Sequence, residues 1–127
     1  MHDRVKYEYA IIRIVPKVER EEFFNVGVIL FSKRKKFLDV KYLINPNKLN
    51  CFCTEIKIST LNAYLEAWQS ICKGDASGGA IGKLELADRF RWLAASRSTI
   101  IQSSETHSGL CSDPKKELDD LFKDYIL

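Results

Sequence analysis

Three segments near the start of the chain have the pattern of β-strands and follow one another at short intervals. Residues 5–15, VKYEYAIIRIV, alternate at first and then become apolar on both faces, which indicates a strand whose second half lies deep in a sheet. Residues 23–32, FFNVGVILFS, are rich in β-branched and aromatic side chains, and residues 37–43, FLDVKYL, alternate cleanly. Short connections join antiparallel neighbours, so these segments predict an antiparallel meander. Gly27, inside the second segment, predicts a bulge or a close approach by a neighbouring strand.

The rest of the chain has the pattern of helices. A helix is predicted from about Ser59, with Gly74 well placed to end it. A second helix is predicted over residues 84–95. Asp113 predicts the N-cap of a last helix, because Pro114 follows at its first position.

Between the second and the last helix, residues 98–104, STIIQSS, predict a fourth strand, and residues 105–112, ETHSGLCS, predict a loop. The predicted order is β-β-β-α-α-β-α. We therefore expect one α+β domain over residues 1–127: an antiparallel sheet of about four strands, packed with two to three helices in two layers.

The composition is that of a globular protein, since 46% of the residues are hydrophobic and 29% are charged. The longest apolar run, residues 26–31, is too short to cross a bilayer. The first residues, MHDRVKYEY, show no hydrophobic signal segment. We expect a cytoplasmic protein with no membrane partner.

The net charge of +3 is unevenly distributed. Residues 1–60 carry 12 Lys and Arg against 7 Asp and Glu, a balance of +5, and residues 61–127 carry 8 against 10, a balance of −2. The densest basic run is KRKK, residues 33–36. It is typical of a solvated hairpin tip, and a loop that contacts phosphates is the alternative.

The four cysteines do not predict a metal site. Cys51 and Cys53 form a C-x-C pair, but no second pair has the spacing of a zinc site. A site made with Cys111 and His107 is conceivable, but buried thiols are the commoner use of cysteine. We predict no metal and no cofactor.

Residues 89–111, RFRWLAASRSTIIQSSETHSGLC, concentrate the candidate binding residues. Arg89 lies four residues after Glu85, the spacing of a surface ion pair on a helix. Arg91 lies three residues after Asp88 and has the same interpretation. Residues two apart on a helix point about 200° apart, so the two arginines are not expected to line one pocket from the same face.

The segment after the second helix contains a possible anion cradle, Arg97 with Ser98 and Thr99. The alternative is that Arg97 binds the carbonyls that end the helix. Gln102 is either a specificity donor on an open strand face or an ordinary sheet-surface amide.

Trp92 is either part of the core or an exposed anchor for a partner. His107 is the only histidine in the interior of the sequence, and as a general base it would need Ser108 or Cys111 beside it. The residues around it more often form a hydrogen-bonded turn.

Taken together, residues 7–125 resemble the bacterial family catalogued as domain of unknown function 3037. The resemblance rests on YEYAIIRIVPKVEREEFFNVGVILFS, on IGKLELADRFRWLAASRSTIIQSSETHSGLC and on DPKKELDDLF, in that order. The chain departs from the family pattern at Ser96, where the family has a proline. The positions that match the family pattern are Asn25, Gly27, Arg89, Phe90, Arg91, Trp92, Arg97, Ser98, Thr99, Gln102, His107, Gly109 and Cys111.

The resemblance implies an accessory protein that packs against a partner, and the partner it suggests is a HipA-like kinase of a toxin–antitoxin operon. Our first hypothesis is therefore a non-enzymatic module that binds a protein partner. The second is a module that binds phosphate or nucleic acid through the basic meander and Arg97. The third, an enzyme that uses His107, has no complete catalytic motif in the sequence.

Overall fold

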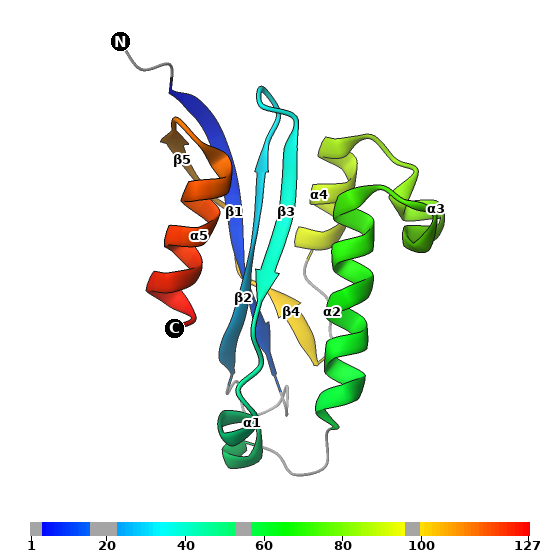
Figure 1. Ribbon diagram of the computed structural model, residues 1–127, viewed down its shortest axis with the longest axis vertical. Helices are drawn as coiled ribbons and strands as arrows, with labels where there is room; N and C mark the ends of the chain where they lie inside the picture. The colour runs from blue at the N-terminus through cyan, green and yellow to red at the C-terminus, as the bar shows by residue number, and fades with distance from the viewer. Residues whose placement is uncertain (1–3, 16–22, 53–56, 96–99) are drawn as a thin grey trace.

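One antiparallel sheet of five strands forms within the part of the chain that the computed structural model describes, residues 4–15, 23–52, 57–95 and 100–127 (Figure 1). The strands are β1 (Val5–Ile14), β2 (Phe24–Ser32), β3 (Phe37–Tyr42), β4 (Ile101–Ser103) and β5 (His107–Cys111). Their order is β3-β2-β1-β4, and β5 also pairs with β1. The α+β class and the predicted meander β1-β2-β3 are both confirmed.

Gly27 has both properties that the sequence predicted. The β1–β2 register shifts between Ile12 and Arg13, beside Gly27, so β2 contains a bulge there. A Cβ atom on Gly27 would lie 2.7 Å from the Lys41 carbonyl oxygen of β3. Only a residue without a side chain fits between these two strands.

The loop predicted over residues 105–112 is wrong, because residues 107–111 form β5. This strand pairs with the first half of β1, from Tyr9↔His107 to Val5↔Cys111. β4 pairs with the second half of β1, from Ile12↔Ser103 to Ile14↔Ile101. HSGLC has no alternating apolar pattern, so β5 forms because the long strand β1 leaves part of its edge open.

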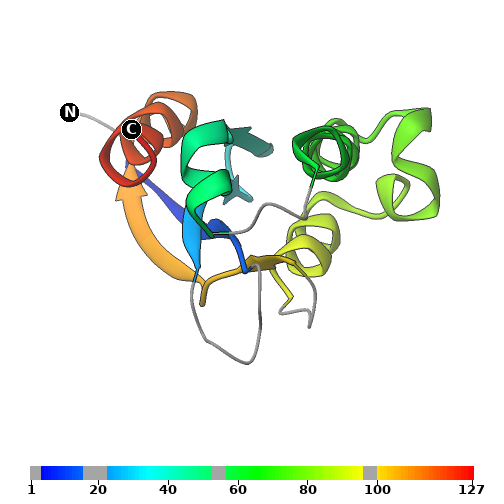
Figure 2. The same ribbon diagram turned by 90° about the horizontal axis from the view of Figure 1, so that it is seen from below.

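The helices lie on both faces of the sheet. They are α1 (Pro46–Phe52), α2 (Ile58–Lys73), α3 (Gly79–Gly82), α4 (Leu86–Ala94) and α5 (Pro114–Tyr125), with a 3₁₀ turn at Ala76–Gly78 before α3. Figure 2 shows α5 on one side of the sheet and α2 and α4 on the other. The structure thus has three layers where two were expected.

A buried central strand explains the third layer. Along β2, Ile29 packs with the residues of α2 and α4, whereas Val28 and Leu30 pack with Leu118 and Phe122 of α5. Apolar side chains point to both sides of this strand, so each side requires a cover. The apolar stripe of α5 provides the second cover.

Helix ends follow the predicted signals. Gly74 has a φ of 69° and ends α2, with its N–H directed at the Ser70 and Ile71 carbonyls. Asp113 caps α5 by accepting a hydrogen bond from the backbone N–H of Lys115. No helix in the described ranges is long and apolar enough to cross a membrane.

Candidate functional site

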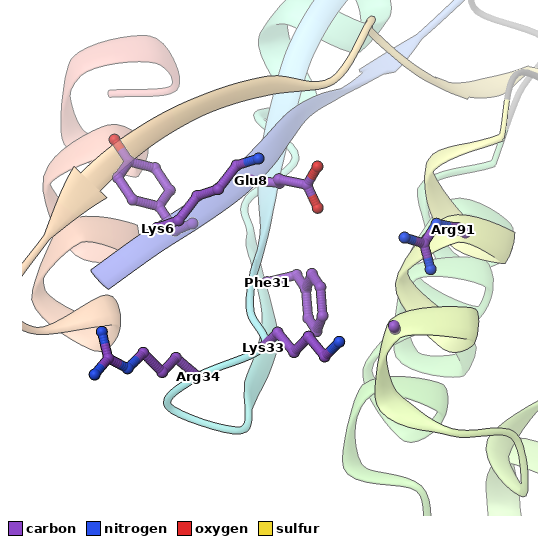
Figure 3. Close-up of a pocket in the computed structure, with 8 residues that line it drawn as sticks. Lys6, Glu8, Phe31, Lys33, Arg34 and Arg91 are labelled. Atoms are coloured by element: carbon purple, nitrogen blue, oxygen red, sulfur yellow. The ribbon is translucent and has the colours of Figure 1, made fainter.

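A hollow of about 660 Å³ lies between α4 and the sheet, next to the β2–β3 turn (Figure 3). Four cationic side chains and one carboxylate are among the residues around it. The lining residues are Lys6, Tyr7, Glu8, Phe31, Lys33, Arg34, Ala87 and Arg91. The charged side chains sum to +3, from four positive and one negative.

Strand and helix periodicity position these side chains. Alternate residues of a strand point to opposite faces, so Lys6 and Glu8 point away from the α5 side, where Tyr7 packs. On α4, Ala87 and Arg91 are one helical turn apart and share a face. Both side chains therefore face the exposed polar part of β1, at Lys6 and Glu8.

Two stacked aromatic rings pack α4 against strand β2 of the sheet. The Phe31 and Phe90 rings stack with their centroids 5.2 Å apart, and both side chains are buried. The polar side chains beyond this stack remain open to solvent.

Lys33 and Arg91 approach the hollow from opposite walls. In Figure 3, Glu8 and Lys33 point toward α4, Arg91 points back toward the sheet, and Arg34 points away from α4. Among the described residues, no hydrogen bond or ion pair engages the side chains of Lys33 and Arg91. Within the described part of the chain, these two cations of one hollow thus have no carboxylate partner within 4 Å.

Two further hollows extend the first one along α4. The second, about 220 Å³, shares Glu8 and Arg91 with the first. The third, about 670 Å³, shares Ala94 and Thr106 with the second. We call these three adjacent hollows the α4 groove. The second is also lined by Phe90 and Ala95, and the third by Arg13, Gln102, Ser103, Ser104, Glu105 and His107.

The segment after β4 is fixed to β1 beside the groove. The backbone N–H of Ile11 donates to Ser104 Oγ at 2.8 Å, and the N–H of Ser104 donates to the Ile11 carbonyl at 2.8 Å. Ser103 Oγ donates to the Leu93 carbonyl of α4 at 3.1 Å. These bonds place Thr106 and His107 opposite the end of α4.

The groove contains some of the candidate residues predicted from the sequence. Arg91 lines its basic end, and Gln102 and His107 line its far end. Trp92 is outside the lining and exposes 39% of its surface, so it is not part of the core. The predicted cradle Arg97, Ser98 and Thr99 lies outside the described residues.

Arg89 lies elsewhere, between α4 and the end of α2. Its Nη1 atom donates to the carbonyl oxygens of Ile71 and Cys72, at 2.9 Å each. Within the described ranges, no ion pair joins Arg89 to Glu85, and none joins Arg91 to Asp88. The two arginines do point to different sides, as their spacing predicted.

The sequence did not single out Lys6 or Glu8, and it indicated Thr106 only as part of the segment around His107. Lys6 and Glu8 occupy ordinary solvent-facing positions of an alternating strand, and nothing local shows that α4 lies opposite them. The KRKK run was the one available signal for Lys33.

His107 lies next to Tyr9, and neither Ser108 nor Cys111 is placed to act as a nucleophile beside it. The centroids of the Tyr9 and His107 rings are 5.3 Å apart. Ser108 is the next residue of β5 and points to the opposite face. Cys111 is buried and lies four residues along the strand, about 13 Å away at ~3.3 Å per residue. Burial raises the pKa of its thiol, and Glu117 and Asp113 raise it further, while Lys35 lowers it.

No three His, Cys, Asp or Glu side chains in the described ranges are grouped so that they could hold a metal ion. The groove itself offers cations, carboxylates, hydroxyls, the Gln102 amide and the His107 imidazole.

Comparison with known proteins identifies the family. No curated protein and no solved structure matches the chain. The sequence model of one family, described as "Protein of unknown function (DUF3037)", matches residues 9–126, which is nearly the whole chain. The chain therefore belongs to the DUF3037 family.

Proposed function

We propose that the chain is a non-enzymatic binding module that holds an anionic ligand at the basic end of the α4 groove. The observation that carries this proposal is the placement of Lys33 and Arg91 on opposite walls of one hollow, with no carboxylate partner among the described residues. Carboxylate or phosphate oxygens between them would accept charge-assisted hydrogen bonds from both sides. Arg91 can bind such a group through two parallel bonds.

Glu8 restricts which anions fit. Its carboxylate lies in the same hollow, so an anion with charge on every side would be repelled there. A ligand that combines an anionic group with a hydroxyl or amide donor would satisfy both Glu8 and the cations. The hollow therefore suits an anionic group on a larger molecule better than a bare ion.

The family resemblance implies a protein partner, and we propose that this partner carries the anionic group. A HipA-like kinase is the partner that we propose. We expect the module to act in the cytoplasm, where the free thiols of Cys72 and Cys111 would stay reduced. Nucleic acid is the second candidate, because the exposed turn Lys33, Arg34, Lys35 and Lys36 extends the basic surface past the hollow.

The test is affinity purification of the tagged protein from its host at low and at high salt, with mass spectrometry for proteins and absorbance for nucleic acid. The double variant Lys33→Glu/Arg91→Glu reverses the two cations that approach each other across the hollow. The matched control, Lys48→Glu/Lys57→Glu, reverses two exposed lysines outside it, and urea unfolding checks that each variant is folded.

We expect wild type and control to retain the same species in stoichiometric amount, and the Lys33/Arg91 variant to lose it. Nucleic acid that is released as the salt concentration rises would favour the second candidate. A species that all three proteins retain equally would refute the proposed site.

A further inference from the structure

The α4 groove continues well past its basic end. Three hollows share lining residues along the whole of α4, from Lys33 at the β2–β3 turn to His107 at the start of β5. α4 has nine residues and is therefore about 13 Å long at ~1.5 Å per residue. About four residues of extended polypeptide, at ~3.3 Å each, have the same length.

The distribution of charge along the groove is uneven. Lys6, Lys33 and Arg91 line the first hollow, whereas the third contains Arg13 and Glu105, one charge of each sign. A nucleic-acid strand carries a phosphate at every step, so it would meet Glu8 and Glu105 as well as the cations. A polypeptide can have its acidic side chains at one end alone.

The second hollow forms the middle of the groove. Besides Glu8, Phe90 and Arg91, it is lined by the smaller side chains of Ala94, Ala95 and Thr106. The aromatic rings at this level, Phe31 and Phe90, are stacked on each other and expose 5% and 2% of their surface. Among the described residues at this level, a nucleic-acid base would find no open ring face on which to stack, whereas a peptide backbone with small side chains needs none.

Thr106 offers hydrogen bonds to a passing backbone. It is exposed, it lines both the second and the third hollow, and its hydroxyl both donates and accepts. An extended peptide carries an N–H and a C=O at every residue, which match this chemistry.

We propose that the ligand of the α4 groove is an extended segment of a protein partner. Its acidic end lies between Lys33 and Arg91, and its small or neutral residues run along Ala94 and Thr106. This inference rests on the proposed function, because it requires that the basic end binds an anion.

The test uses a fluorescent peptide with three glutamates at one end and alanines, serines and asparagines over the rest, prepared with the glutamates at either terminus. The same peptide with glutamines and an oligo-dT of similar length are the comparison probes. Anisotropy measures binding of each probe to wild type and to three variants. Lys33→Glu/Arg91→Glu reverses two of the four cations at the basic end, and Thr106→Tyr fills the middle. Ser112→Tyr is a matched control just after β5, outside the groove.

We expect one glutamate peptide to bind wild type and Ser112→Tyr equally well. Both Lys33→Glu/Arg91→Glu and Thr106→Tyr should weaken it about tenfold or more. If oligo-dT binds through Lys33 and Arg91 and neither peptide does, the peptide inference fails and the anion site stands.

If the peptide depends on Lys33 and Arg91 but Thr106→Tyr behaves like Ser112→Tyr, the ligand does not run along the groove, and the inference fails again. If no probe responds to Lys33→Glu/Arg91→Glu, the inference and the proposed function fail together.

Discussion

The guanidinium of Arg89 donates a hydrogen bond of 2.9 Å to the carbonyl oxygen of Cys72, in the last turn of α2. The same nitrogen reaches the Ile71 carbonyl. The last carbonyls of a helix have no partner within the helix, so Arg89 supplies what the end of α2 lacks. It also joins α2 to α4, the helix that forms one wall of the groove.

Replacing Arg89 should therefore affect stability more than binding. We expect Arg89→Ala to lower the free energy of unfolding by about 2 kcal/mol, since two carbonyl acceptors lose a charged donor. Arg89→Lys should lose less, because an ammonium can still reach one carbonyl. Urea unfolding measures both changes. An Arg89→Ala protein as stable as wild type that no longer bound its ligand would place Arg89 in the binding site after all.

Gly74 is constrained by the same arginine. Its φ of 69° is strained for any residue with a side chain, and an added Cβ atom would lie 2.6 Å from Arg89 Nη1. We expect Gly74→Ala to cost about 1 kcal/mol for the backbone and more for displacing the guanidinium. Gly79→Ala is the control, because Gly79 has a φ of 63° but nothing lies within 4 Å of its added Cβ. Equal losses in urea unfolding for the two variants would show that the contact with Arg89 has no cost.

A second glycine fixes a tyrosine on the α5 face. An added Cβ atom on Gly109 would lie 2.8 Å from the Tyr7 hydroxyl oxygen and 2.9 Å from its ring carbons. Tyr7 donates a hydrogen bond of 3.0 Å to Glu117 of α5. Burial raises the pKa of the Tyr7 phenol, and the Glu117 carboxylate raises it further.

We expect Gly109→Ala to push the Tyr7 ring aside, weaken this bond and lower the free energy of unfolding by about 1–3 kcal/mol. Ser108→Ala, at the exposed neighbouring position of β5, should change stability by less than about 0.5 kcal/mol. Urea unfolding of the two variants decides the matter, and similar midpoints would contradict the contact.

Local patterns were enough to predict the meander and the helices α2, α4 and α5, but not the short helices α1 and α3. Alternation along β1 and β3, the Gly74 signal and the Asp113–Pro114 signal all depend on residues close in sequence. β5 was missed because His107–Cys111 becomes a strand only by pairing with β1, which lies far away in the chain. The position of α5 was missed for a similar reason, since an apolar stripe shows that a helix needs cover but not which face provides it.

The same distinction applies to the groove. Arg91, Gln102 and His107 stood out as polar residues in one short segment. Lys6 and Glu8 did not, because they belong to the groove only through the packing of α4 against the sheet, which the stacked Phe31 and Phe90 rings maintain. A charge pattern in one strand contains no information about which helix will face it.

Cys72 gives a prediction of how stability depends on pH. Burial, with a smaller contribution from Asp39, raises the pKa of its thiol to about 12, while Arg89 lowers it. The unfolded chain has an ordinary thiol pKa of about 8.5, so above that pH the unfolded state loses the proton that the folded state keeps. The free energy of unfolding should therefore fall as the pH rises from about 8.5 toward 12.

Between pH 8 and pH 10, Cys72 accounts for a loss of about 1–2 kcal/mol in the free energy of unfolding. Cys72→Ala leaves a cavity and is therefore less stable than wild type at pH 8, but it lacks this pH-dependent contribution. The difference in unfolding free energy between wild type and Cys72→Ala, measured by urea at the two pH values, should thus shrink at pH 10. A difference that stays constant would show that the thiol ionises as easily in the folded protein as in the unfolded chain.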